Sequence, residues 1–160
     1  TPGCGPRHIV FHPNLSVMYV MCELEPRVLV YEQETLHGTW GLVGEHDSEL
    51  PERAHASAPA AIKFHPSGRV LTVSNRFSDS LQQFYVDASS GRLSAGRNVR
   101  LPGKTPRDFT FSADGRRLIA LCQDSNEAFS YSVDPTTGEM EDKPTDRVEM
   151  GTPVCIVGTT

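Results

Sequence analysis

The sequence contains no apolar run approaching the roughly 18 residues that a membrane-spanning helix needs. It has no basic stripe either, because 15 Lys and Arg residues against 20 Asp and Glu residues give a formal net charge of −5. Nucleic acid and anionic membranes are therefore poor partners for this chain. No CxxC pair and no zinc-type spacing occurs among Cys4, Cys22, Cys122 and Cys155. We expect reduced, structural thiols in a cytoplasmic protein that needs no metal and no cofactor.

The sequence also lacks a convincing amphipathic helix. Its apolar residues occur in short runs such as residues 69–73 and 117–121, which are β-rich and too short for helices. The 13 Gly and 12 Pro residues suit many short strands joined by tight turns. An apolar fraction of 38% is sufficient to bury a core. These features together predict an all-β protein.

A repeat runs through the chain. Its phase is marked by Pro6, Pro59, Pro106 and Pro153, which by subtraction lie 53, 47 and 47 residues apart. A phenylalanine, an aromatic residue and a glycine follow each of the first three prolines at offsets of 5, 25 and 32: Phe11, Phe64 and Phe111; Tyr31, Phe84 and Tyr131; Gly38, Gly91 and Gly138. Columns that align in this way indicate a structural repeat.

Each unit reads as four short strands separated by turn-forming residues, and the fourth strand is expected to start near Thr39, Arg92 and Glu139. Four strands in about 47 residues are typical of a β-propeller blade, whereas a β-sandwich would not explain the repeated phase. We therefore predict about three four-stranded blades and the start of a fourth. The predicted units are residues 6–58, 59–105, 106–152 and 153–160. Because three blades cannot close a ring, we expect the chain to be part of a longer propeller.

Strand order predicts which residues gather at one end of the channel. In a four-stranded meander, the entry to the first strand and the loop between the second and third strands lie at the same end. In a propeller the first strand lines the channel, so these segments from every blade surround one opening, here called the mouth. The polar residues predicted to lie there are Arg7, His8, Glu23, Arg76, Arg107, Asp108 and Gln123.

Two interpretations of this group stay open. Unpaired charges beside apolar strands are costly to bury, so Glu23 could simply neutralise Arg7 or Arg76 at the rim of the channel. Alternatively, the arginines bind a phosphate or carboxylate while Glu23 acts on a water molecule or a proton. The second interpretation makes the mouth a site for an anionic small molecule.

Other polar residues are weaker candidates. His12 and His65 lie in His-Pro turns at the end opposite the mouth, where we expect a role in the turn. A further group lies in the irregular insertion of the first unit, and it consists of Glu45, His46, Asp47, Glu49 and His55. Its members show no fixed ligand spacing, so we expect a solvated loop there instead of a metal site.

Several segments resemble the lactonase family of seven-bladed β-propellers, which includes 6-phosphogluconolactonases and carboxy-muconate lactonising enzymes. The resemblance is carried by residues 5–13 (GPRHIVFHP), 73–76 (VSNR), 103–107 (GKTPR), 118–125 and 134–138. It covers essentially the whole chain, with each unit matching a different blade. The resemblance implies a seven-bladed parent protein, of which this chain is the later part.

The resemblance also implies roles for individual residues. Arg7, Glu23 and Arg76 match the family's two arginines and its glutamate, whereas its histidine belongs to a preceding blade. His8, Arg107, Asp108 and Gln123 are then expected to bind substrate. The family often carries Glu at the position of Ala61, Gly-His at Phe77-Ser78 and His at Asp108, so this chain departs from it near the mouth.

These observations predict a lactone hydrolase that acts on an anionic lactone such as 6-phosphogluconolactone, in the oxidative pentose phosphate pathway. Two alternatives stay open: an isomerase that forms or opens a muconolactone, and a non-catalytic propeller that binds a ligand or a protein. Since three blades hold only part of the predicted site, we expect this segment to be inactive alone.

Overall fold

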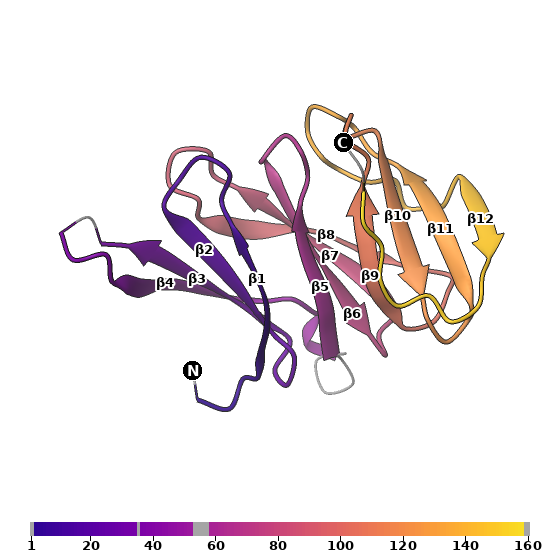
Figure 1. The fold of residues 1–160 in the computed structure, drawn as a ribbon, viewed down its shortest axis with the longest axis horizontal. Coiled ribbons are helices and arrows are strands. Elements are labelled where there is room, and N and C mark those ends of the chain that lie inside the picture. Colours follow the sequence, from indigo (N-terminus) through magenta and orange to yellow (C-terminus); the bar gives the residue numbers. More distant parts are fainter. Residues whose placement is uncertain (1, 35, 53–57, 159–160) are drawn as a thin grey trace.

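The computed structural model describes residues 2–34, 36–52 and 58–158. Within these residues twelve β-strands form three antiparallel sheets of four strands each, so the predicted all-β architecture of four-stranded blades is confirmed. Figure 1 shows the three sheets next to one another along the molecule. No helix in the described part of the chain is long and apolar enough to cross a membrane.

In every sheet the strands follow one another in chain order. The first sheet consists of β1 (Pro6–Phe11), β2 (Val17–Cys22), β3 (Arg27–Gln33) and β4 (Trp40–Asp47). The second consists of β5 (Ala58–Phe64), β6 (Val70–Arg76), β7 (Ser80–Val86) and β8 (Leu93–Arg100). The third consists of β9 (Pro106–Phe111), β10 (Arg117–Cys122), β11 (Glu127–Ser132) and β12 (Asp146–Glu149). The first strands β1, β5 and β9 contact one another in that order.

The turns between the third and fourth strands form as their sequences predict. Asp87 Oδ1 accepts hydrogen bonds from the backbone and hydroxyl groups of Ser89 and Ser90, and these bonds lower the pKa of Asp87 to about 2. Gly91 closes this turn at φ 68°, in the left-handed region that glycine adopts without strain. The local sequence therefore favours the turn, and the hydroxyl of Tyr19 in the first sheet holds it further by donating to the carbonyl of Gly91 at 2.6 Å.

The fourth strand of the third sheet lies further along the chain than expected. We predicted that it starts near Glu139, but Met140 forms only an isolated bridge with Val133. The strand β12 that pairs with β11 begins at Asp146. Pro144 lies between the bridge and the strand, and it has no backbone N–H to donate to a ladder. The ladder therefore resumes only after the proline.

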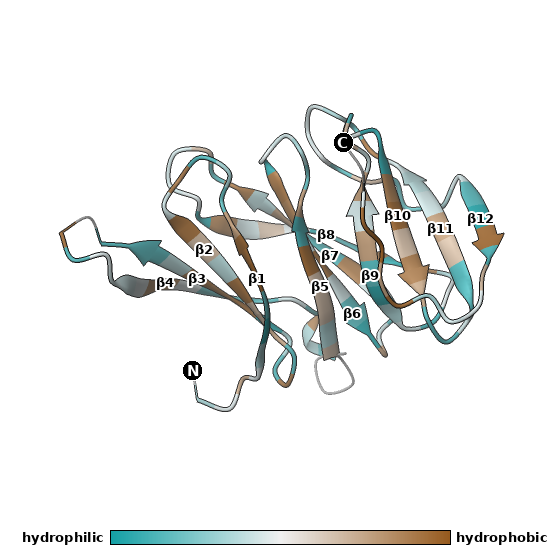
Figure 2. Cartoon of the chain, viewed as in Figure 1, coloured by the Kyte–Doolittle hydropathy of each residue, from teal (hydrophilic) through white to brown (hydrophobic). Residues whose placement is uncertain are grey.

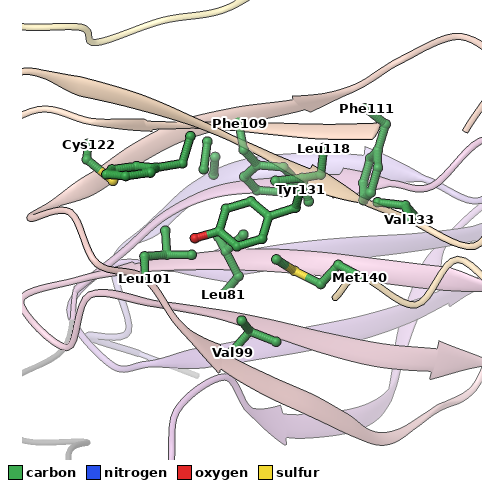
Figure 3. Close-up of a cluster of buried hydrophobic side chains, with 13 residues drawn as sticks. Leu81, Val99, Leu101, Phe109, Phe111, Leu118, Cys122, Tyr131, Val133 and Met140 are labelled. Atoms are coloured by element: carbon green, nitrogen blue, oxygen red, sulfur yellow. The ribbon is translucent and has the colours of Figure 1, made fainter. Parts of the chain in front are cut away.

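Most of the core lies in two apolar layers, one on each side of the second sheet, and Figure 2 shows apolar residues along its strands. A smaller cluster in the first sheet consists of Cys4, Val20, Cys22 and Leu29. Successive side chains of a strand point to opposite faces. Ile62 of β5 accordingly packs in the layer shared with the first sheet, and Ala61 in the layer shared with the third. In the latter layer Leu81 and Val99 lie beside Tyr131 of the third sheet (Figure 3). This packing fixes the sheets relative to one another and so positions the loops at their ends.

Candidate active site

One irregularity recurs in the first strand of every sheet, at the mouth. The pairing of β1 with β2 skips Arg7, that of β5 with β6 skips Ala60, and that of β9 with β10 skips Arg107. A residue inserted into a ladder in this way is left unpaired and its side chain is re-aimed. The repeat thus supplies one unpaired residue per blade at the mouth, and in two of the three blades that residue is an arginine.

Glu23 links the first two sheets at the mouth. It lies directly after β2, where its backbone N–H donates to the carbonyl of Gly5 at 2.7 Å. Its Oε2 is 3.5 Å from Nε of Arg7, and its Oε1 accepts a hydrogen bond from the guanidinium of Arg76. Arg76, the last residue of β6, is held further by a 3.2 Å bond from its Nε to the carbonyl of Ala58. One carboxylate therefore holds two arginines from neighbouring blades.

Arg7 and His8 lie together at the first strand. The Arg7 guanidinium is 3.0 Å from Nε2 of His8, and it also donates to the carbonyl of Ala60. Burial lowers the pKa of Arg7, and the nearby Arg76 and Arg107 act in the same direction, while Glu23 opposes them. Burial, reinforced by the charge of Arg7, also lowers the pKa of His8, so the neutral imidazole is favoured.

Arg107 differs from the other two arginines. Its Nη1 donates to Oε1 of Gln123 at 2.9 Å, which orients the guanidinium without neutralising it. Within the described residues it forms no ion pair with a carboxylate. Glu23 is the one carboxylate that pairs with these arginines among the described residues. The three arginines and Glu23 together therefore carry 3 − 1 = 2 positive charges. Such an excess favours a bound anion.

Asp108 is occupied by other groups. It is buried, and its Oδ1 lies 2.9 Å from Nζ of Lys63. Its Oδ2 accepts the backbone N–H of Ile156 at 2.9 Å. The sequence did not single out Lys63, because it lies near the end of β5 that is opposite the mouth. Asp108 thus connects β9 to β5 through Oδ1 and to the segment after β12 through Oδ2.

Residues 45–49 of the insertion do not form a solvated loop, so that expectation was wrong for them. Glu45, His46 and Asp47 lie in β4, and the side chain of Glu49 is buried. A strand forms there because these residues pair with β3. The sequence of the insertion alone does not reveal this partner strand. His55 lies outside the described residues. Among those that the structure describes, no group of three or more His, Cys, Asp and Glu side chains could hold a metal ion.

Glu49 anchors the loop that follows Arg76. Its Oε2 accepts hydrogen bonds from the hydroxyls of Ser78 and of Ser80, the latter at 3.0 Å. From the other side Asp79 accepts the Nζ of Lys104 at 2.7 Å. Two largely buried carboxylates thus fix residues 76–80 to the connections before and after their own sheet. The position of Arg76 is therefore determined by three sheets and not by its own strand alone.

The histidines opposite the mouth take the turn role predicted for them. Nδ1 of His12 accepts the backbone N–H groups of Asn14 and Leu15, both at 3.1 Å. Nδ1 of His65 is 2.8 Å from the hydroxyl of Ser67, and its Nε2 lies 2.8 Å from the carbonyl of Gly115 in the next sheet. These rings complete turns and connect sheets, which leaves the mouth as the candidate site.

A sequence profile of the lactonase family, described as a 7-bladed β-propeller, matches residues 1–158. The chain is 32% identical over 155 residues to the 6-phosphogluconolactonase of Bacillus subtilis, a match that covers 97% of this chain and 44% of that relative. It is 34% identical over 138 residues to the 6-phosphogluconolactonase of Yersinia pestis, covering 86% of this chain and 41% of that relative.

Solved structures agree with the sequence relatives. A periplasmic gluconolactonase of Pseudomonas aeruginosa superposes with a TM-score of 0.86 at 30% identity, covering 97% of this chain and 42% of that one. A protein from Lactobacillus plantarum superposes with a TM-score of 0.88 at 27% identity, covering 96% and 44%. The chain thus spans less than half the length of these relatives. From its repeat, its three sheets and the profile that they match, the chain belongs to the lactonase family of seven-bladed β-propellers.

Proposed function

We propose that the full-length protein hydrolyses an anionic lactone of the 6-phosphogluconolactone type. The observation that carries this proposal is that Arg7 and Arg76 share the carboxylate of Glu23 at the mouth, while the nearby Arg107 has no acidic partner among the described residues. Two relatives that share about a third of its residues are named 6-phosphogluconolactonases, in agreement with the chemistry of the site. We propose the cytoplasm as the compartment in which it acts.

In the proposed reaction a water molecule attacks the lactone carbonyl, and the ring C–O bond then breaks to give a hydroxy acid. Arg76 and Arg107 bind the phosphate, because guanidinium groups match phosphate oxygens bidentately. Arg7 stabilises the oxyanion of the tetrahedral intermediate, where negative charge develops. Glu23 accepts a hydrogen bond from the attacking water and so orients it, together with a histidine that we place on a blade outside this chain.

His8, Gln123 and Asp108 have supporting roles in this proposal. His8 contacts Arg7, and Gln123 orients Arg107, so both act on the substrate through the arginines that they hold. Asp108 is paired with Lys63, and its proposed role is to stabilise β9, the first strand of the third sheet. We therefore place Asp108 outside the direct contacts with substrate.

The test replaces Glu23 and Arg76 together by Ala in the full-length protein. The joint change removes the Glu23–Arg76 pair as a unit, but it also leaves Arg7 without its carboxylate partner, so the free energy of unfolding should fall by only about 1 kcal/mol. Lactone hydrolysis, followed by proton release above the spontaneous rate, should fall by at least about 100-fold. The matched control replaces Arg27 and Glu45, an exposed ion pair 2.8 Å apart, by Ala. This control variant should keep full activity. Unchanged hydrolysis in the Glu23/Arg76 variant would contradict the assignment.

A further inference from the structure

Phe77 combines an unfavourable backbone with an unfavourable surface position. It follows Arg76 in the loop between β6 and β7, and its φ is 68°. A bulky residue in this left-handed region is strained, whereas glycine is not. Its side chain is 64% exposed, so burial of the ring in the core does not offset the strain. A strained, exposed aromatic ring beside a candidate site points to a role in function.

The surroundings of the loop explain how the strain persists. The hydroxyls of Ser78 and Ser80 are held by Glu49, and the carboxylate of Asp79 is held by Lys104. Asp79 Oδ1 also accepts the backbone N–H of Thr105 at 2.9 Å. These bonds fix the backbone on the C-terminal side of Phe77 from two neighbouring connections. The loop is therefore held by contacts that do not involve the side chain of Phe77.

The ring of Phe77 lies at the mouth beside the arginine group. Its centroid is 5.8 Å from Cζ of Arg76, the guanidinium that Glu23 also holds. A ligand anion bound by Arg76 would therefore have an apolar surface next to it. We propose that Phe77 is a specificity-determining residue that packs against the C–H face of the lactone ring, a proposal that rests on the proposed function. The ligand class is then an anionic lactone with an apolar ring face.

The test compares Phe77→Gly with Phe77→Ala in the full-length protein, because both remove the ring but only glycine relieves the strain. With 6-phosphogluconolactone, both variants should raise KM about tenfold at nearly unchanged kcat. Only Phe77→Gly should also raise Tm. Phe77→Tyr keeps the ring and should keep the wild-type KM.

Each outcome decides one question. An unchanged KM in the Gly and Ala variants overturns the role of Phe77 and leaves the proposed function intact. A lowered Tm of Phe77→Gly shows that the ring acts structurally, and this also overturns the inference. Wild-type protein that hydrolyses no lactone contradicts the proposed function itself. In that event the rise in Tm caused by 6-phosphogluconate tests Phe77 separately, and an equal rise in wild type and Phe77→Gly overturns its role.

A second, independent observation concerns two thiols below the mouth. The Sγ atoms of Cys4 and Cys22 are 2.7 Å apart, and both side chains are buried. The carbonyl of Cys4 accepts the backbone N–H of Leu24 at 3.1 Å, and Glu23 donates to the neighbouring Gly5. The backbone therefore holds the segment before β1 against the turn that carries Glu23. We infer that Cys4 and Cys22 form a disulfide under oxidising conditions.

The reaction needs an external oxidant of the disulfide class. The two thiols lose two protons and two electrons to one molecule of oxidised glutathione, which becomes two molecules of glutathione. Burial raises the pKa of the Cys22 thiol to about 12, so little thiolate exists and the exchange is slow. The same burial protects the bond once it has formed.

The test incubates the full-length protein with oxidised glutathione for hours, alkylates free thiols after denaturation and digests with trypsin without reductant. Mass spectrometry should find residues 8–27, which contain Cys22, linked to the peptide that ends at Arg7. Cys122, equally buried but with no thiol beside it, is the control and should be alkylated in every sample. Oxidation should raise Tm by several degrees in wild type but not in Cys4→Ala. Alkylated or glutathionylated Cys4 and Cys22 peptides without the cross-link would overturn the inference.

Discussion

The two ends of the sheets use their polar side chains differently. Opposite the mouth, the polar groups bind backbone: His65 reaches the carbonyl of Gly115 in the next sheet, and His12 accepts two backbone N–H groups. At the mouth, charged side chains bind one another across sheets, as Glu23 does with Arg7 and Arg76. These bonds to the backbone add stability, although the buried Nε2 of His12 has no partner among the described residues. Guanidinium groups that share one carboxylate keep N–H groups that a ligand can occupy.

This difference predicts that substitutions opposite the mouth change stability, whereas substitutions at the mouth change activity. The same three sheets form both ends, so the two kinds of substitution can be compared within one fold.

The largest effect is expected opposite the mouth, for His65→Ala in the full-length protein. The change empties a buried site and leaves the carbonyl of Gly115 without its partner. The free energy of unfolding should fall by about 3 kcal/mol. Urea unfolding measures this loss, and kcat/KM per folded molecule should stay the same. A large drop in kcat/KM with intact stability would break the distinction between the two ends.

A smaller effect is expected at the mouth, for Arg107→Gln. The guanidinium has no carboxylate partner in the described chain, so its loss leaves no acidic group uncompensated there. KM for 6-phosphogluconolactone should rise about 10- to 30-fold, equivalent to about 1.4–2 kcal/mol of binding. The free energy of unfolding should change by less than about 0.5 kcal/mol. A loss of stability without a change in KM would show that Arg107 is structural.

The smallest effect is expected for the pH dependence of the His12 turn. Burial lowers the pKa of His12 below 6.5, and Nδ1 must stay unprotonated to accept its two N–H donors. The unfolded state therefore binds the proton more readily. The stability that neutral His12 contributes is fully present above pH 6.5 and is lost as the pH falls below it. The His12→Asn variant keeps an acceptor in the turn but has no imidazole to protonate. Between pH 7.5 and 5.5 its free energy of unfolding should therefore fall by about 0.5 kcal/mol less than that of wild type. Equal losses in urea unfolding would show that His12 does not titrate there.

Much of this comparison could be predicted from the sequence. The repeat places Arg7 at the start of a first strand and Glu23 and Arg76 at the ends of second strands, all at the mouth, and in the structure Glu23 contacts both arginines. This works because antiparallel meanders fix which loops share an end, whatever the details of packing. The turn roles of His12 and His65 follow in the same way from the residues around them.

The remainder depends on contacts that no column of the repeat records. Glu49 has no counterpart in the other units, so its burial against the loop of Ser78 and Ser80 leaves no trace in the sequence. Lys63 likewise meets Asp108 only because the sheets pack at a particular distance. The late start of β12 reflects a proline within one unit, which a shared phase does not reveal. Whether the mouth residues act on substrate stays a prediction.

The unpaired residue in each first strand has a consequence for how such proteins diversify. Because it lies outside the ladder, its side chain can be exchanged without disturbing the pairing on either side. The three sheets carry Arg7, Ala60 and Arg107 at this position on the same backbone. A single codon change at Arg7 or Arg107 can therefore remove a charge at the opening, whereas the position of Ala60 is buried. Selection can retune what the ring admits one blade at a time, while the architecture is inherited unchanged.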